Sequence, residues 1–280
     1  MTFTKHYPTA EEAAAAVRHH QWLASHAGPL RQPDLTAIAP QSLTYTRVEG
    51  RHATPDDLPL LADLLGDAHG AAWSDRLHQT SMVTPCHYFA DGTLFGAYLA
   101  PRQAALRARR RSGFLPSDAA LASMLTILEE TAEGPAAFYK DSNLRNFLIT
   151  GDGTVFAVDP DQLTLAPFGY DLAKLVLSMI LTYGPQPAHV TDEALAAYNA
   201  AAHRHHPALG ATSRARFDDF MALHAVLTAP YLGRNGYRLP GAPHDHHGTR
   251  LRPPRRGPLQ RRGDARADGA TSFGLRIPAP

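Results

Sequence analysis

The sequence predicts an α+β fold in which a small, strand-containing N-terminal part precedes a larger and mainly helical part. Two observations lead to this fold class. A strand-like segment at 42–48 lies between two helix-like segments, and a short hairpin at 147–158 lies among long segments with apolar residues at helical spacing. Hydrophobic residues make up 44% of the 280 residues, so the chain has enough apolar surface for a sizeable core.

The elements of the N-terminal part follow from local signals. Residues 9–27 are mostly Ala, Glu, Arg, His and Gln, and Thr9 is placed to cap a helix there. Residues 42–48 alternate apolar and polar side chains of β-favouring types and predict a strand. A second helix is predicted over 54–72, where Thr54 is followed by proline and two aspartates and then by leucines at helical spacing.

Turn and capping residues predict the elements that follow. A helix is expected over 99–111, with a proline tolerated in its first turn, and another from Pro116 to near Gly134. The segment Gly-Asp-Gly-Thr at 151–154 joins two β-like runs and is a strong hairpin signal. Three further helices are predicted after the hairpin, at 170–183, 192–203 and 215–228.

Composition excludes several classes of protein. The longest strongly apolar stretch, 175–181, is far shorter than the roughly 20 residues needed to cross a bilayer. The N-terminus lacks the apolar core of a secretory signal. The single cysteine, Cys86, excludes an intrachain disulfide and a cysteine-rich metal site. We therefore expect a cytoplasmic protein with no membrane partner.

The C-terminal residues, 237–280, differ in composition from the rest of the chain. They contain nine Arg, seven Pro and six Gly, with few large apolar residues that could form a packed face. Such a segment cannot offset the entropy lost on ordering, so we expect a disordered tail. No aromatic residue alternates with the arginines to stack on bases, so no specific nucleic-acid partner is expected.

Three polar residues around the predicted hairpin carry the clearest chemical signal. Asp141 and Asn146 lie five residues apart, and Asp159 follows the second short strand. Because a tight turn brings the far ends of its strands together, Asn146 and Asp159 should lie side by side, with Asp141 facing them across one loop. One carboxylate that accepts a hydroxyl proton, beside an amide and a carboxylate that hold Mg²⁺, suits phosphoryl transfer. The alternative is that all three are ordinary turn residues.

The segment from Tyr139 to Asn146, with the hairpin ending at Asp159, resembles the catalytic loop and metal-binding hairpin of the protein-kinase-like fold. Within that fold it is similar to the aminoglycoside phosphotransferase and choline kinase-like families of small-molecule kinases. Gly-Tyr-Asp-Leu-Ala at 169–173 resembles a helix-opening motif of the same families. The resemblance implies a two-lobe fold, with a reduced small β lobe at 1–48 and a mainly helical large lobe at 49–236.

The resemblance also implies roles for the matching residues. Asp141 corresponds to the catalytic base, Asn146 and Asp159 to the magnesium ligands, and Asp171 to a carboxylate that supports the catalytic loop from behind. Tyr139 stands where the family usually has a structural histidine, and is expected to take over its support.

Two further loop residues depart from, or add to, the family pattern. Lys140 replaces the small residue that usually precedes the catalytic aspartate. Arg145 is a candidate for offsetting charge on the transferring phosphoryl group, although a surface arginine is an equal alternative.

The N-terminal residues resemble part of the family's nucleotide site. Lys5 corresponds to the strand-borne lysine that reaches the ATP phosphates, and its expected acidic partner is Glu11 or Glu12. The backbone that would pair with adenine belongs to Thr46, Arg47 and Val48. Because the sequence begins at the lysine-bearing strand, we expect the preceding glycine-rich hairpin to be missing and the small lobe to be curtailed.

The function implied by the resemblance is transfer of the ATP γ-phosphoryl group, with Mg²⁺, to a hydroxyl of an aminoglycoside-like or amino-alcohol acceptor. Acidic residues of the helical lobe could attract such an amine, the candidates being Asp192, Glu193, Asp218 and Asp219. One alternative is a pseudokinase or binding module without the glycine-rich loop. Another is a phosphatase of the haloacid dehalogenase type, because the predicted strand that begins at Val155 ends in Asp-Pro-Asp at 159–161.

Overall fold

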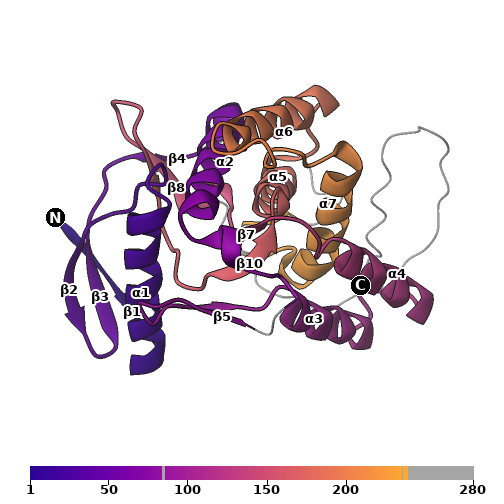
Figure 1. Ribbon diagram of the computed structural model, residues 1–280, viewed down its shortest axis with the longest axis horizontal. Helices are drawn as coiled ribbons and strands as arrows, with labels where there is room; N and C mark the ends of the chain where they lie inside the picture. The colour runs from indigo at the N-terminus through magenta and orange to yellow at the C-terminus, as the bar shows by residue number, and fades with distance from the viewer. Residues whose placement is uncertain (84–85, 235, 239–280) are drawn as a thin grey trace, which may run out of the picture.

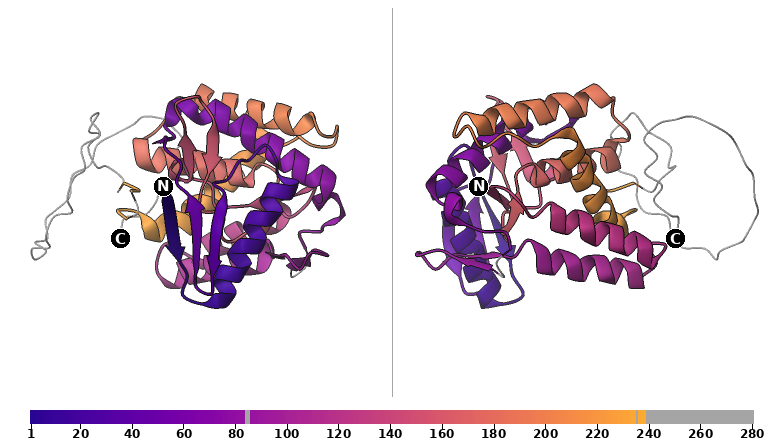
Figure 2. Two further views of the ribbon diagram at one scale, coloured as in Figure 1. Left: turned by 90° about the vertical axis from the view of Figure 1, so that its left-hand side faces the viewer. Right: turned by 45° about the vertical axis from the view of Figure 1, so that its right-hand side comes forward.

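The computed structural model describes residues 1–83, 86–234 and 236–238, which form two lobes (Figure 1). The smaller lobe is an antiparallel sheet with the strand order β1-β3-β2, and helix α1 packs on it. The bounds of these elements are β1 (Thr2–His6), α1 (Ala10–His26), β2 (Leu35–Ala39) and β3 (Ser42–Thr46). Figure 2 shows the sheet and helix from the outer side of this lobe.

The small lobe has its own apolar core. Ala13 and Ala16 of α1 pack with Leu43 and Tyr45 of β3 and with Tyr7, which follows β1. The alanines give α1 a narrow inner face, so the helix can lie close to the sheet. The hydroxyl of Thr9 accepts a hydrogen bond from the backbone N–H of Glu12 at 3.2 Å, and the predicted cap is therefore confirmed.

The larger lobe is mainly helical, and α5 (Tyr170–Tyr183) runs through its centre with almost every residue buried along its first three turns. The helix α2 packs along α6, and a Cβ on Gly66 would collide with the backbone carbonyl of Tyr198, so this close approach requires glycine. The other helices are α2 (Leu58–Asp75), α3 (Leu99–Arg111), α4 (Asp118–Glu130), α6 (Ala188–His203) and α7 (Arg214–Thr228).

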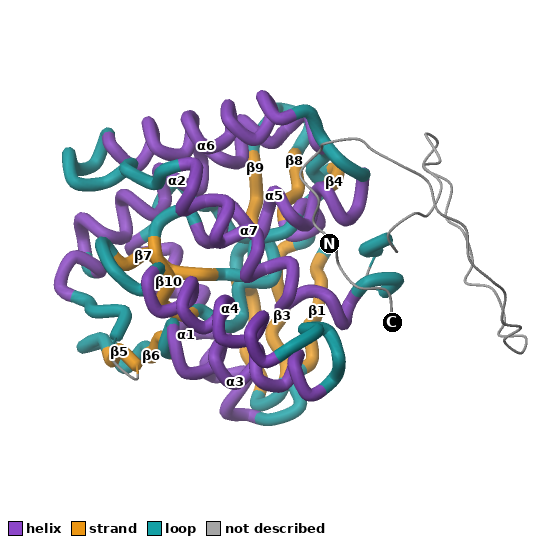
Figure 3. The backbone as a smooth tube through the Cα atoms, turned by 90° about the vertical axis from the view of Figure 1, so that its right-hand side faces the viewer, coloured by secondary structure: helices purple, strands orange, loops and turns teal. Residues whose placement is uncertain are grey.

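Short strands connect the helices of the larger lobe (Figure 3). One sheet has the order β5-β6-β10-β7 and the other the order β4-β8-β9. Their bounds are β4 (Arg51–His52), β5 (Cys86–Tyr88), β6 (Leu94–Gly96), β7 (Ala136–Tyr139), β8 (Phe147–Ile149), β9 (Val155–Ala157) and β10 (Thr164–Pro167). The described residues also include four single turns of 3₁₀ helix: η1 (Pro55–Asp57), η2 (Leu77–Gln79), η3 (Leu144–Asn146) and η4 (Ala229–Tyr231).

The strand pairing corrects one of the alternatives derived from sequence. A haloacid dehalogenase-type phosphatase needs a doubly wound parallel sheet. Among the strands of the described residues, only β6 and β10 pair in parallel, and every other pair is antiparallel. The Asp-Pro-Asp segment therefore follows a hairpin strand, and the predicted α+β class is confirmed.

The predicted tail lies almost wholly outside the described residues, since 239–280 are not described. Its first two residues are described and make hydrogen bonds with α5. The hydroxyl of Tyr237 accepts from Lys174 at 3.1 Å, and the backbone N–H of Arg238 donates to the carbonyl of Leu181 at 2.8 Å. These two contacts hold residues 237 and 238 against α5. In the described part of the chain, no helix is both long and apolar enough to span a membrane.

Candidate active site

The loop between β7 and η3 presents Asp141 to solvent in an unusual backbone conformation. Its φ angle is +60°, in the left-handed region that few residues other than glycine adopt. Oδ1 of Asp141 accepts a hydrogen bond from the hydroxyl of Tyr139 at 2.7 Å and lies 3.1 Å from Nζ of Lys174. Both contacts use Oδ1, so within the described residues Oδ2 has no partner and is open to a ligand.

The surroundings of Asp141 keep its carboxylate ionised. Burial alone would raise the pKa of Asp141, but the Lys174 ammonium and the Tyr139 hydroxyl outweigh it and hold that pKa below its usual value. Burial in turn would lower the pKa of Lys174, and the Asp141 carboxylate and Tyr237 reverse that effect, so the lysine keeps its charge. The site thus contains an ionised acceptor of protons beside a buried cation.

Sequence reasoning missed Lys174, although a signal for it was present. Lys174 follows Asp171 by three residues, and residues at this spacing lie on the same face of a helix. Because Asp171 was already expected to lie behind the catalytic loop, its helical neighbour was a candidate for the same loop.

Asp171, in the first turn of α5, holds the loop from behind. Its carboxylate accepts hydrogen bonds from the backbone N–H of Ser142 at 2.8 Å, the Ser142 hydroxyl at 2.9 Å and the backbone N–H of Lys140 at 3.3 Å. The residues on both sides of Asp141 are therefore tied to one buried carboxylate. This arrangement limits how far the Asp141 backbone can relax from its strained conformation.

The β8–β9 hairpin brings Asn146 and Asp159 to the same place. Phe147 pairs with Ala157, and the backbone N–H of Val158 donates to the Asn146 carbonyl at 2.9 Å, so Asp159 follows directly. The Asn146 amide N–H donates to the backbone carbonyl of Asp141 at 3.2 Å. Its Oδ1 has no hydrogen-bond partner among the described residues. Asp159, like Asp141, has a positive φ, of +62°.

Lys5 of β1 reaches across from the small lobe to this hairpin. Its ammonium group contacts the carboxylates of both Asp159 and Asp161. The hydroxyl of Tyr7 donates a further hydrogen bond to Asp161 at 3.0 Å. Asp161 is a second residue that sequence reasoning had not assigned to the kinase-like site.

The expected partner of Lys5 was wrong. Glu11 and Glu12 lie exposed in the first turn of α1, and neither forms an ion pair with Lys5. Because the carboxylates of Asp159 and Asp161 both contact the Lys5 ammonium group, its charge is balanced without a glutamate from α1.

The donor set at the hairpin fits a magnesium ion. Mg²⁺ prefers carboxylate and amide oxygens and keeps several waters, so a complete protein cage is not needed. Two carboxylates, of Asp159 and Asp161, already converge on one cationic group, and Asn146 adds an amide oxygen next to them. Within the described part of the chain, no group of three His, Cys, Asp or Glu side chains forms a closed metal site.

A cavity of about 630 Å³ lies between the small lobe and the hairpin, and all four residues expected to contact the nucleotide line it. Of the three expected adenine-pairing residues, two have their backbone N–H groups occupied. Thr46 donates to the carbonyl of Asp34 at 2.8 Å and Arg47 to that of Met1 at 3.1 Å. Val48 alone of the three keeps an N–H without a partner in the described structure.

A second cavity, of about 900 Å³, extends from the catalytic loop to α3, α5 and α7. Arg145 lines it with an exposed side chain. Lys5, Asn146, Asp159 and Asp161 line both cavities, so these residues form the junction between them. The charged side chains along the larger cavity are Lys5, Arg102, Arg109, Lys140, Arg145 and Lys174, together with Asp141, Asp159 and Asp161.

Comparisons with known proteins identify the family and the fold of this chain. The model of the family described as phosphotransferase enzyme family matches residues 2–211. A search of curated protein sequences finds no match. Among solved structures, a type I macrolide 2'-phosphotransferase has a TM-score of 0.54 at 17% identity, covering 82% of this chain and 77% of that one.

Two further solved structures share the fold. The choline kinase LicA from Streptococcus pneumoniae has a TM-score of 0.52 at 13% identity, covering 81% of this chain and 74% of its own. An amicoumacin kinase, solved with AMP-PNP, Ca²⁺ and amicoumacin, has a TM-score of 0.50 at 16% identity, covering 81% and 72%. At these identities the likeness concerns the two-lobe, protein-kinase-like fold alone.

Proposed function

The chain belongs to the phosphotransferase enzyme family, and on that premise we propose that it transfers the γ-phosphoryl group of ATP to a hydroxyl group of a small molecule. The observation that carries the proposal is the junction of the two cavities. Asn146 and Asp159 line both cavities, and Asp141, whose Oδ2 is open, lines the larger one. A nucleotide in the smaller cavity and an acceptor in the larger one would therefore meet at these residues.

The proposed reaction is a direct transfer. The acceptor oxygen attacks the γ-phosphorus, a new P–O bond forms, and the bond to the β–γ bridging oxygen breaks so that ADP leaves. The hydroxyl proton passes to Oδ2 of Asp141, because Tyr139 and Lys174 occupy Oδ1 and keep the carboxylate ionised until then. Lys174 also supplies positive charge close to the transferring group.

The nucleotide is proposed to bind with its base in the smaller cavity, where Val48 offers its free N–H. Lys5, released from the two aspartates, would contact the phosphates, and Arg145 would contact the transferring group from the large-lobe side. Bound by Asn146 and Asp159, Mg²⁺ would neutralise phosphate charge. The amicoumacin kinase solved with AMP-PNP and Ca²⁺ supports a nucleotide and a divalent cation as the ligands.

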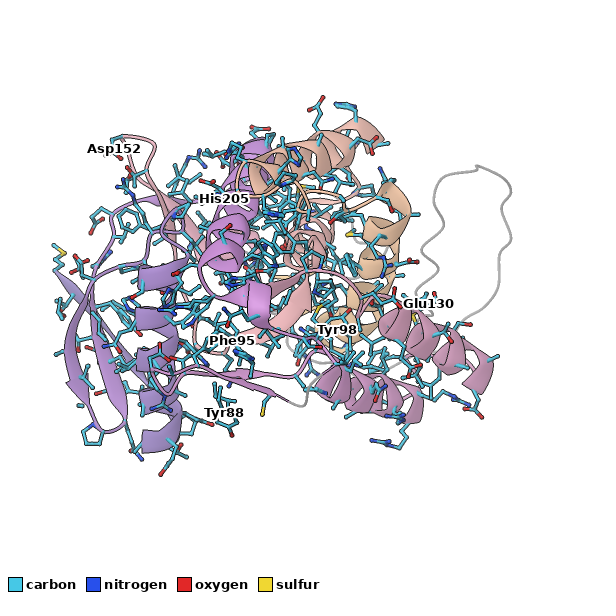
Figure 4. The ribbon with its side chains drawn as sticks, in the orientation of Figure 1. Tyr88, Phe95, Tyr98, Glu130, Asp152 and His205 are labelled. Atoms are coloured by element: carbon cyan, nitrogen blue, oxygen red, sulfur yellow. The ribbon has the colours of Figure 1, made fainter. Side chains whose placement is uncertain are left out.

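A titration with Mg–ATP tests this proposal. Asp159→Ala removes a carboxylate that would face the metal, so its affinity for Mg–ATP should be well below that of the wild type. Asp152→Ala is the matched control, because Asp152 lies at the tip of the same hairpin, away from both cavities (Figure 4). Equal affinity of the wild type and Asp159→Ala would reject the metal site. If neither protein binds the nucleotide, the chain is instead a non-catalytic relative or a binding module.

A further inference from the structure

The larger cavity has a charge pattern that bears on the acceptor. From this pattern we propose, building on the function above, that the acceptor carries an anionic group, a carboxylate or phosphate, in addition to the hydroxyl that is phosphorylated. The anionic group would contact Arg109 and lie near Arg102, both on the face of α3 that lines the cavity. Arg102 and Arg109 are seven residues apart, which is two helical turns and a rise of about 10 Å.

Arg102 is a buried cation without an acidic partner. Its side chain is 7% exposed, and the described residues include no carboxylate within ion-pair distance of it. The guanidinium donates to the hydroxyls of Tyr170 at 3.0 Å and Thr164 at 3.1 Å, and to two backbone carbonyls just before α3. It also lies over the rings of Tyr98 and Tyr139, and Figure 4 labels the former at the start of α3.

These contacts give most of the N–H groups of Arg102 a hydrogen-bond acceptor, but every acceptor is neutral and none balances the positive charge. Burying a charge without a counter-charge is unfavourable, and an anion bound in the adjoining cavity would offset that cost. The neutral partners also hold the guanidinium in one orientation. Arg102 is therefore an organised source of positive potential on the cavity wall.

Arg109 supplies a group that a ligand can contact directly. Its side chain is half-buried, and its Nε and Nη2 both donate to the backbone carbonyl of Leu227, at 3.3 and 3.0 Å. Within the described residues, Nη1 has no partner. A guanidinium fixed along one edge presents the other edge for hydrogen bonds to a carboxylate or phosphate.

The carboxylates that line the same cavity are all occupied by cations. Asp141 pairs with Lys174, and Asp159 and Asp161 pair with Lys5. An acceptor amine would therefore meet carboxylates whose negative charge a lysine already balances. With ATP bound and Lys5 on its phosphates, Asp159 would hold Mg²⁺ and Asp141 would keep its pairing with Lys174.

The acidic residues that the sequence suggested for an amine acceptor do not reach the cavity. Asp192 and Asp218 both pair with Arg214 on the surface of the helical lobe. Glu193 and Asp219 are likewise absent from the residues that line the cavity.

The two arginines are not explained by the nucleotide. Neither Arg102 nor Arg109 lines the smaller cavity, whereas Lys5 and Arg47 do. The ATP phosphates at the junction are thus provided with separate cations. The positive charge of Arg102 and Arg109 is therefore available to a ligand in the larger cavity.

Binding of two matched sets of hydroxyl compounds tests the inference. The first set is glucuronate, glucose 6-phosphate, glucose and glucosamine. The second set is 4-(hydroxymethyl)benzoate, benzyl alcohol and 4-(aminomethyl)benzyl alcohol, whose ring suits the tyrosines of the cavity. Each compound is titrated calorimetrically into the full chain saturated with Mg–AMP-PNP. In at least one set, the anionic member should bind about tenfold or more tightly than the amine.

Substitutions on α3 then test whether the preference for the anionic compound depends on Arg109. Arg109→Gln should remove most of the preference for the anionic member, and Arg109→Glu should reverse it toward the amine. Arg107→Gln is the matched control, since Arg107 is exposed on the same helix and does not line the cavity. Circular dichroism and the affinity for Mg–AMP-PNP show that each variant is folded.

The possible outcomes separate this inference from the proposed function. An amine that binds as tightly as its anionic counterpart would overturn the inference, and so would the failure of every anionic member to bind at millimolar concentrations. A preference that survives Arg109→Gln, or that Arg107→Gln also removes, would overturn it as well. If the wild type does not bind Mg–AMP-PNP, the proposed function itself fails, and this first step detects that before any acceptor is added.

Discussion

The ammonium group of Lys174 lies 3.1 Å from the same carboxylate oxygen of Asp141 that the Tyr139 hydroxyl contacts. The lysine comes from α5 and the aspartate from the loop after β7, so a helix and a loop far apart in sequence meet at one atom. The lysine side chain is only 8% exposed, whereas that of the aspartate is 59% exposed. A buried cation thus holds an accessible carboxylate, and the pair has consequences for catalysis that can be measured.

Removing the lysine should shift the pH dependence of turnover. Asp141 must be ionised to accept a proton, so activity is lost as pH falls through its pKa. Lys174 lowers that pKa, and Lys174→Met should therefore move the acidic limb of the kcat–pH profile to higher pH. The profile can be recorded as ATP hydrolysis, with water as the acceptor. Lys174→Arg keeps the charge and should restore much of the original profile, whereas an unchanged limb in Lys174→Met would contradict this role.

Replacement of the proposed base should affect the rate more than nucleotide binding. Asp141→Asn keeps the shape of the side chain but cannot take the hydroxyl proton, so kcat should fall by about 10²–10⁴-fold. The Kd for Mg–ATP should change little, because Asn146 and Asp159 remain in place. Steady-state rates and calorimetry separate the two quantities. A large loss of nucleotide affinity with an unchanged kcat would reverse the assignment.

Two buried histidines should make the free energy of unfolding depend on pH. Burial lowers the pKa of His69 to about 3, and burial together with Lys174 lowers that of His224 to about 3. Below pH 6.5 the unfolded chain binds protons at these residues and the folded chain does not. The free energy of unfolding should therefore fall as pH drops toward 3, by about 1.4 kcal/mol per pH unit for each histidine.

Urea titrations between neutral and acidic pH measure this dependence. His69→Gln and His224→Gln should each reduce the slope by about one proton, whatever their effect on stability at neutral pH. His189→Gln, at an exposed position on α6, is the matched control for the substitution itself. Unaltered slopes in both buried variants would rule out this source of acid sensitivity.

The turn that begins the α2 region should contribute measurably to stability. Asp57 accepts hydrogen bonds from the backbone N–H of Thr54 at 2.8 Å and from both terminal nitrogens of Arg51, at 2.6 and 2.7 Å. The Arg51 contact, with those from Thr54, lowers the pKa of Asp57 to about 2. Asp57→Ala should lower the free energy of unfolding by about 1 kcal/mol at neutral pH. Asp56→Ala, at the exposed neighbouring position, should cost much less in the same denaturation experiment.

Helices with local signals could be predicted from the sequence, because caps and apolar spacing act over a few neighbouring residues. The predicted helix at 99–111 coincides with α3, and that at 170–183 coincides with α5. The strands β5, β6 and β10 could not be predicted in the same way. Each has only three or four residues, too few for a clear local pattern. The strand β10 depends on pairing with β6 and β7 from earlier parts of the chain, and β5 pairs with β6, so pairing rather than local preference creates these strands.

In the candidate site too, contacts set by local sequence could be predicted, whereas contacts set by tertiary packing could not. The hairpin signal was sufficient to predict that Asn146 and Asp159 lie close together, since one tight turn determines their distance. The pairing of Lys5 with Asp161 joins two lobes and depends on tertiary packing, which no local pattern reports. His19 likewise depends on tertiary packing: it is buried, with its ring nitrogens near the backbone carbonyls of Leu94 and Asp161.

The left-handed backbone of Asp141 and Asp159 places the proposed catalytic roles of these residues in conflict with thermostability. An aspartate in that conformation is less stable than glycine by about 1 kcal/mol, because its Cβ crowds the backbone. Glycine at position 159 would accordingly relieve this backbone strain, and would raise the melting temperature of a protein that had lost its proposed metal ligand. A library selected only for heat resistance would thus tend to discard the carboxylates themselves, so any effort to engineer a hardier version of this chain must select for turnover at every round.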